Sequence, residues 1–147
     1  MREILFKAKK IGDGEWVEGY YFAKPILEKH FIILGENQWM IDRSTLSQYT
    51  GLTDKNGNKI WENDIVRFKH GKVCFDDELF PWEKTCLLNK EEYTRNYIVE
   101  FCNTPTHYGL RLRNCSIWFM VHKMTILMHD AEVIGNIFDN PELMEVK

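Results

Sequence analysis

Two sets of acidic residues have types and spacings that suit catalysis or metal binding. Glu62 and Asp64 are two residues apart, so on a strand both carboxylates share one face, where they could hold a divalent cation or work as an acid–base pair. Asp76, Asp77 and Glu100 resemble a nuclease carboxylate set, although no lysine stands two positions after Glu100. Short polar residues that bracket a turn explain Glu62 and Asp64 equally well. A metal-dependent hydrolase is therefore the less favoured alternative.

Other catalytic patterns are missing from the sequence. It contains no G-x-S-x-G, no phosphate-binding loop, no dinucleotide fingerprint and no H-E-x-x-H. The four cysteines are widely spaced without a C-x-x-C pair, which favours buried thiols over a zinc site. We predict no catalytic residue, no metal and no cofactor, and a binding role is favoured over an enzyme.

Cationic side chains give the candidate binding sites. Arg111 and Arg113 alternate with leucines, so both project from one strand face, within a stretch from Phe101 to His129 that has no acidic residue. Their fork geometry suits phosphate or carboxylate, but the acidic segment 76–92 or the acidic tail could neutralise them within or between subunits.

A second basic group follows the central turns, with aromatic residues near it that could stack on bases. In the alternative interpretation its lysines only protect an edge strand from pairing, which fits a net charge of −3 and a pI near 6.0. The binding candidates from both groups are Tyr49, Trp61, Arg67, Lys69, Lys72, Arg111 and Arg113.

Bulk composition indicates an ordered globular protein. Of the 147 residues, 44% are hydrophobic, 14% aromatic and 28% charged. The first ten residues lack the apolar core of a secretion signal, and no apolar run approaches the roughly 20 residues of a membrane span. We therefore expect a soluble cytoplasmic protein without a membrane partner.

Alternating apolar residues and turn formers predict many short strands. The first hairpin joins 4–8 to 16–22 and ends at Pro25, and a second joins 31–34 to 39–41. Ser44 is predicted to cap one helical turn that Gly51 closes.

The central segment 48–66 contains the strongest turn signals. Asn56-Gly57 predicts a two-residue type I′ turn that sets Leu52 opposite Trp61. A sharp turn at Asn63-Asp64 then leads into 65–69, and His70-Gly71 returns the chain into 72–75. This succession of short strands and tight turns resembles an SH3-like element around 60–76.

Later segments continue the β pattern. A hairpin joins 97–102 to 108–113, 131–138 is a final strand, and Pro141 begins a one-turn helix capped by Asn140. The pattern leaves open whether 77–96 is loop or helix and whether 115–129 is strand or helix. The fold class is mainly β, with short antiparallel strands that form a small barrel or two packed β units.

Three segments resemble the YopX-like family of phage and prophage proteins. They are Arg2–Ala8 with Trp16–Tyr20, then Tyr49–Val66, and finally Glu132–Leu143. Asn63 stands where the family usually has glycine, and because Asn tolerates left-handed backbone, the turn should survive.

The resemblance implies one YopX-like domain over 1–147, with possible units 1–50 and 51–147, and a phage-encoded cytoplasmic protein. It implies no activity and no catalytic residues. From the aromatic content and the complementary acidic and basic segments, we expect a homo-oligomeric binding module, with a host protein or nucleic acid as possible partner.

Overall fold

The computed structural model describes residues 4–70, 93–104, 107–114, 117–121 and 131–145. These ranges hold only strands and short 3₁₀ helices, so the predicted mainly β class is confirmed. The strands are β1 (Phe6–Lys9), β2 (Trp16–Lys24), β3 (Lys29–Leu34), β4 (Asn37–Met40), β5 (Ser47–Thr53), β6 (Lys59–Trp61), β7 (Asp64–His70), β8 (Tyr93–Thr104), β9 (His107–Asn114), β10 (Ile117–Val121) and β11 (Glu132–Asn136). The helices are η1 (Pro25–Leu27), η2 (Arg43–Thr45) and η3 (Pro141–Met144).

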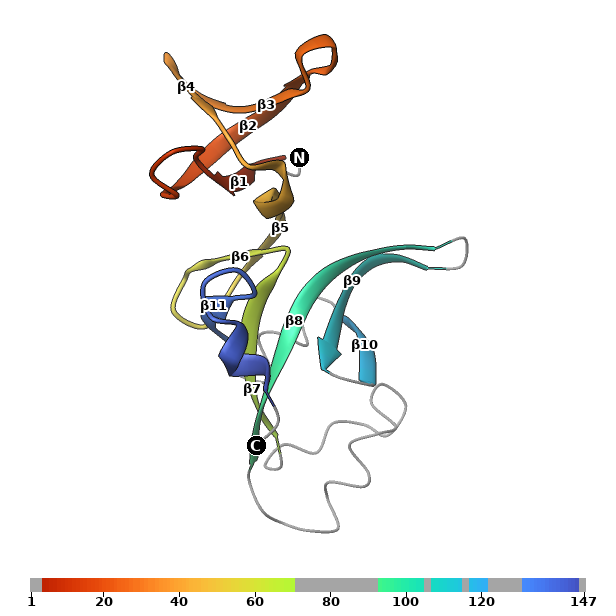
Figure 1. Ribbon diagram of the computed structural model, residues 1–147. Coiled ribbons are helices and arrows are strands. Elements are labelled where there is room, and N and C mark those ends of the chain that lie inside the picture. The colour runs from red at the N-terminus through yellow and green to blue at the C-terminus, as the bar shows by residue number, and fades with distance from the viewer. Residues whose placement is uncertain (1–3, 71–92, 105–106, 115–116, 122–130, 146–147) are drawn as a thin grey trace.

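The strands form two antiparallel sheets (Figure 1). The first has the order β4-β3-β2-β1-β5-β6, and the second has the order β10-β9-β8-β7-β11. Within the described residues neither sheet closes into a barrel, so of the two predicted architectures only the pair of β units remains. The division into units at residue 50 stays a prediction.

The first sheet grows from the two predicted hairpins, which are confirmed. β1 pairs with β2 from Phe6↔Gly19 to Lys9↔Trp16, and β3 pairs with β4 from Phe31↔Met40 to Leu34↔Asn37. After β4 the chain returns to the end of β1, where Lys10 and Ile41 form an isolated bridge. The sheet therefore curls, and its inner face packs Ala8, Ile32 and Ile41 into a core cluster.

The predicted turn after the second hairpin is present, but its cap and its end were wrong. Asp42, not Ser44, caps η2, because its Oδ1 accepts hydrogen bonds from the Ser44 amide and hydroxyl. The helix ends at Thr45, and Gly51 lies instead inside β5, at a φ of +82° where the register with β6 shifts. Gly51 thus serves an irregular strand pairing.

The Asn56-Gly57 turn exists, although the type I′ geometry and the register were wrong. Only Gly57 has a positive φ, and the flanking pair is Thr53↔Lys59. Asp54 explains the difference: its Oδ1 accepts from the amides of Asn56 and Asn58, so a side chain organises a longer loop. Trp61 consequently lies opposite Tyr49 and not Leu52.

The second sheet contains the remaining confirmed predictions. β8 and β9 form the expected hairpin, and part of the undecided region 115–129 is strand β10. η3 begins at Pro141 as predicted, but the Asn140 side chain makes no cap hydrogen bond. β7 pairs with β8 and β11, whereas the predicted strand 72–75 and most of 77–96 lie outside the described residues. The SH3-like element around 60–76 therefore stays a prediction.

Two further core clusters lie at and below the meeting point of the sheets. One contains Leu5, Tyr49 and Trp61. The other contains Ile60, Val66, Phe68, Tyr97, Val99 and Ala131. Because Ile60 belongs to β6 and the rest to the second sheet or its flanks, this cluster packs the β5–β6 hairpin onto the second sheet. Within the described residues, no helix has the length and apolar character that a membrane span requires.

Candidate functional site

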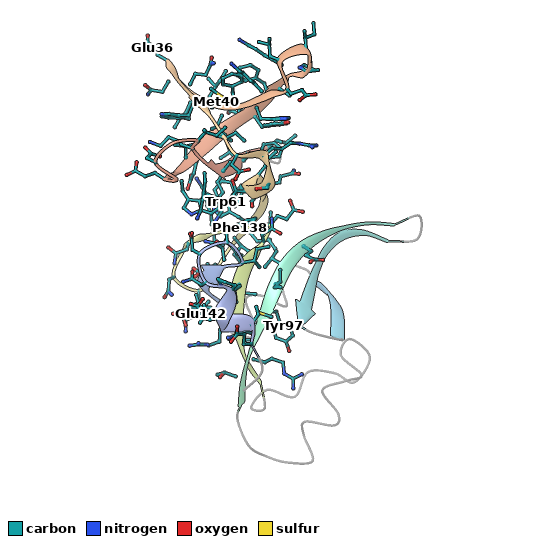
Figure 2. All side chains as sticks on the ribbon, in the orientation of Figure 1. Glu36, Met40, Trp61, Tyr97, Phe138 and Glu142 are labelled. Carbon is teal, nitrogen blue, oxygen red and sulfur yellow. The ribbon has the colours of Figure 1, made fainter. Side chains whose placement is uncertain are left out.

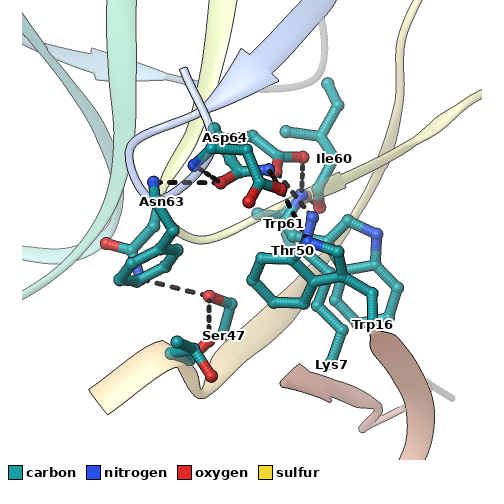
Figure 3. Close-up of polar contacts among 12 residues, drawn as sticks. Lys7, Trp16, Ser47, Thr50, Ile60, Trp61, Asn63 and Asp64 are labelled. Atoms are coloured by element: carbon teal, nitrogen blue, oxygen red, sulfur yellow. Dashed lines mark hydrogen bonds and ion pairs between the residues drawn. The ribbon is translucent and has the colours of Figure 1, made fainter. Parts of the chain in front are cut away.

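Asp64, one of the candidate acids, lies in a buried ion pair between the sheets (Figure 3). Its carboxylate is 1% exposed; Oδ1 accepts from Lys7 Nζ at 2.8 Å, and Oδ2 accepts from the Trp61 amide at 2.8 Å. The Lys7 ammonium also lies 5.0 Å from the ring centroid of Trp16 and 5.5 Å from that of Trp61. Lys7 comes from β1 and Asp64 begins β7, so the pair joins the two sheets.

Burial dominates the electrostatics of Asp64. Desolvation raises the pKa of this carboxyl above its ordinary value, and the charge and hydrogen bond of Lys7 oppose the shift without cancelling it. Burying the ionised Asp64 carboxylate therefore costs free energy, and the Lys7 ammonium beside it offsets part of that cost.

Asp139 forms a second connection between the same parts of the chain. It accepts a hydrogen bond from Trp16 Nε1 at 2.7 Å and one from Lys9 Nζ, and Trp16 also packs against Phe138 with ring centroids 5.9 Å apart. Hydrogen bonds from Lys9, Trp16 and Asn136 lower the pKa of Asp139 to about 2. The C-terminal segment is thereby fixed to the first hairpin.

Backbone hydrogen bonds complete the connection at Asn63. Its amide donates to the Val99 carbonyl at 2.8 Å, and its own carbonyl accepts from the Ile137 amide at 3.1 Å. Asn63 has a φ of +68°, so the prediction that it takes the left-handed conformation is confirmed. Together, Lys7, Trp16, Asn63, Asp64 and Asp139 form what we call the joint.

The joint accounts for Asp64 without catalysis. Both Asp64 oxygens are bonded to groups of the chain, and the described residues contain no cluster of three or more His, Cys, Asp or Glu side chains that could hold a metal ion. Asp76 and Asp77 lie outside the described residues. The arrangement positions the two sheets and uses both Asp64 carboxylate oxygens to do so.

The predicted aromatic binding residues lie in the core. Tyr49 and Trp61 are 9% and 4% exposed, and their ring centroids are 5.4 Å apart beside Leu5. Rings covered by each other and by the core cannot also stack on bases, so the predicted stacking role does not fit their burial.

Four of the predicted basic residues share one face of the second sheet. The register places Arg67 opposite Asn96 and Lys69 opposite Thr94 on β8. On its other side β8 pairs Glu100 with Arg111 and Ile98 with Arg113. Residues 94, 96, 98 and 100 alternate along β8 and therefore lie on one face of the sheet. Each of the four cationic positions is paired with one of them, so all four positions lie on that same face. Lys72 lies outside the described residues.

This basic face also carries acidic positions. Glu100 stands directly opposite Arg111, and Glu132 stands opposite Arg67. Arg67 is exposed, with Nε 3.3 Å from Asn96 Oδ1. The register thus sets an acidic residue of the paired strand opposite Arg111, and neutralisation by the acidic segment 76–92, which lies outside the described residues, stays a prediction.

The outer face of the first sheet carries a group of apolar side chains that the sequence search did not single out. Cross-strand pairing sets Phe22, Phe31 and Met40 in one row, and Tyr20 and Ile33 in the next. We call these five residues the outer patch. Tyr20 and Met40 are 58% and 39% exposed, and Ile26 at the adjoining tip of η1 is 98% exposed. Phe22 and Ile33 are half-buried, and Phe31 is buried, with the Phe22 ring stacked on it. Figure 2 places Met40 at the end of the molecule far from Tyr97 and Glu142.

An open depression of about 500 Å³ lies beside the β1–β2 turn. Its lining includes Lys9, Lys10 and Asp42. Lys9 is bonded to Asp139, Lys10 to Asp13 and Glu15, and Asp42 to Ser44. These three charges are therefore already paired within the chain, and the lining also includes Glu28 and Arg43.

Comparison with known proteins agrees with this geometry. The model of the YopX protein family matches residues 17–145. The chain belongs to the YopX family. The crystal structure of protein EF1440 from Enterococcus faecalis has a TM-score of 0.57 and 19% identity, over 99% of this chain and 100% of that one, which shows a shared fold alone. None of the curated proteins matches the chain.

The three segments that resemble other YopX proteins meet at the joint. Lys7 and Trp16 come from the first, Asn63 and Asp64 from the second, and Asp139 from the third. The sequence interpretation missed Lys7 and Asp139, although their positions inside these segments were the available signal. Asn63, Asp64 and Asp139 lie within the matched residues 17–145, whereas Lys7 and Trp16 precede them, so the family match covers one side of the contacts that hold the sheets together.

Proposed function

We propose that the protein is a non-enzymatic accessory protein of a phage or prophage, an oligomeric binding module that works in the cytoplasm of the host cell. The supporting observation is the outer patch. Apolar side chains gathered on one exposed face commonly mark an interaction surface. The joint uses Asp64 and Asp139 for structure, which leaves binding as the activity that the described residues support best.

The shape of this surface favours a protein partner. Its apolar rows are bordered by Lys24 and Lys29, and Lys24 Nζ lies 5.3 Å from the ring centroid of Phe31. Ile26 projects from η1 beside the patch. An apolar centre with a charged border is the usual anatomy of a protein interface.

Site-specific photocrosslinking tests this function in the bacterial host. A photoreactive phenylalanine analogue at Tyr20 is expected to yield a discrete crosslinked species. The same analogue at Glu142 is the matched control, because Glu142 is exposed in η3 and lies far from Met40 of the patch (Figure 2). Absence of any crosslinked species from Tyr20, or equal yields at both positions, would contradict the proposal.

Nucleic-acid binding is the second candidate, supported by the four cationic positions on one sheet face. Arg67→Ala is then expected to weaken binding to DNA or RNA probes by several-fold and to reduce the salt dependence by about one counterion. Lys29→Ala, which removes an exposed lysine of β3 in the first sheet, is the control. Failure to bind single- or double-stranded probes at low salt would exclude this candidate.

A further inference from the structure

The outer patch has opposite charges at its two ends. Lys24 and Lys29 face each other across β2 and β3 beside η1, at the end where β2 stops and β3 starts. At the other end, Glu18 lies near the start of β2 and Glu36 follows β3 in the turn to β4. The apolar rows of Tyr20 with Ile33 and of Phe22 with Phe31 and Met40 lie between the two charged ends.

This order makes the surface complementary to itself. A twofold axis that lies in the interface and crosses the strands reverses the strand direction of the second copy. Along β3, the midpoint in sequence between Lys29 and Glu36 falls between Phe31 and Ile33, which belong to the two apolar rows. A twofold axis at this midpoint therefore places Lys29 of one copy over Glu36 of the other and keeps the apolar rows in contact. Each lysine end then lies over the glutamate end of the other copy, and the apolar rows of both copies face each other.

We infer that the outer patch is a self-association surface, on which a second copy of this chain packs face to face with its strands antiparallel. This inference rests on the proposed function and names the partner at that surface. Lys29 of one copy lies beside Glu36 of the other. The exposed Glu36 forms no ion pair with another described residue of its own chain, and Lys29 is likewise exposed.

Charge complementarity favours a second copy over a membrane surface or an unrelated acidic protein. Either of those would complement the lysine end but would leave the exposed Glu36 beside like charge or without a partner, whereas Glu18 already pairs with Lys59 of its own chain. Only a partner with the same bipolar pattern satisfies both ends at once. The arrangement also closes after two copies, since the contact is isologous.

Sedimentation velocity of the full chain over the micromolar range tests the inference. The wild type is expected to form a dimer, and Tyr20→Glu is expected to raise the dissociation constant at least tenfold, because it places a charge between apolar rows. Lys55→Glu is the control, because Lys55 is exposed in the loop between β5 and β6, at the opposite edge of the first sheet, and it should dimerise like the wild type. Circular dichroism and thermal unfolding establish that each variant is folded.

A charge exchange makes the test specific for this geometry. Lys29→Glu and Glu36→Lys are each expected to weaken the dimer several-fold, and the double variant is expected to recover most of the loss. A dimer that persists in Tyr20→Glu and shows no recovery in the double variant would overturn the inference and leave the oligomeric function standing. A wild-type chain that stays monomeric at high micromolar concentration would overturn the oligomeric function as well.

Discussion

Removal of the Lys7 ammonium should destabilise the protein far more than removal of an ordinary surface lysine. Lys7→Met leaves Asp64, which is 1% exposed, with the Trp61 amide as the remaining hydrogen-bond donor to its carboxylate among the described residues. At the observed 2.8 Å, the pair attraction is about 6 kcal/mol for an effective dielectric constant of 20. Because the Lys7 side chain is 14% exposed, part of this is already offset by lost hydration. We expect a loss of about 3 kcal/mol, in the range for breaking buried ion pairs.

The converse change is expected to cost less. In Asp64→Asn the amide oxygen can still accept from the Trp61 amide, and Lys7 can reach water while it stays over the Trp16 ring. The expected loss is about 1 kcal/mol. This asymmetry follows from a carboxylate that is more deeply buried than its partner.

Dependence on pH gives a second signature of the same pair. Burial raises the pKa of Asp64, so its contribution to stability is fully present below the ordinary value of 3.8 and is lost as pH rises through the folded-state pKa. In Lys7→Met the opposing charge is gone and the pKa rises further. The deficit of Lys7→Met should therefore shrink as the pH is lowered from neutral to about 5.

Urea unfolding followed by tryptophan fluorescence at both pH values measures these differences. Lys59→Met is the control, because its pair with Glu18 is longer, at 3.6 Å, and both side chains are over 40% exposed. It should change the free energy of unfolding by less than about 0.5 kcal/mol. If Lys7→Met matches this control at neutral pH, the buried pair does not hold the sheets together and the reasoning fails.

Three further substitutions probe other parts of the fold. Gly19→Ala should lower the midpoint of thermal unfolding markedly, because the added Cβ would lie 2.2 Å from the Ile33 carbonyl oxygen. Gly14→Ala should have a smaller effect, because the space around Gly14 is open. Equal effects of the two substitutions would contradict the close approach of β3 to Gly19. Asp54→Ala should cost about 2–4 kcal/mol in urea unfolding, since it leaves the amides of Asn56, Asn58 and Val133 without their acceptor; a neutral result would contradict that loop geometry. Asp139→Asn should lower the free energy of unfolding by about 1 kcal/mol at neutral pH after solvent screening. Because the pKa of Asp139 in the folded protein is about 2, below the ordinary 3.8, this difference from the wild type should vanish as the pH falls from 4 to 2. A difference that stays constant with pH would argue against this role of Asp139.

Local chemistry was sufficient to predict most strands. The alternation of apolar residues in β1 to β4 and the positive φ of Asn63 follow from neighbours in the sequence, and both are confirmed. The errors arose where a side chain overrode a backbone preference. Asp42 took over the cap from Ser44, and Asp54 turned the Asn56-Gly57 hairpin into a longer loop. Both effects are local, because each Asp accepts from amides two to four residues further along the chain, as Asp commonly does at turns.

The candidate site was harder to predict, because burial depends on packing between distant segments. Trp61 and Tyr49 looked like binding residues from their types, yet they pack on Leu5, more than forty residues away. The shared face of Arg67, Lys69, Arg111 and Arg113 depends on the register of β7 and β9 against β8. The outer patch was hidden for a similar reason, since Tyr20 and Met40 come together only through β3.

Native-state hydrogen exchange measures most directly whether the segments typical of YopX proteins join the two sheets. The amides of Asn63 and Ile137 bridge the joint, while those of Ile32 and Val66 report on the interior of the first and second sheet. The joint predicts that all four exchange only with global unfolding and share one free energy of opening. Exchange at Asn63 and Ile137 through a local opening of much lower free energy, with Ile32 and Val66 still protected, would contradict it.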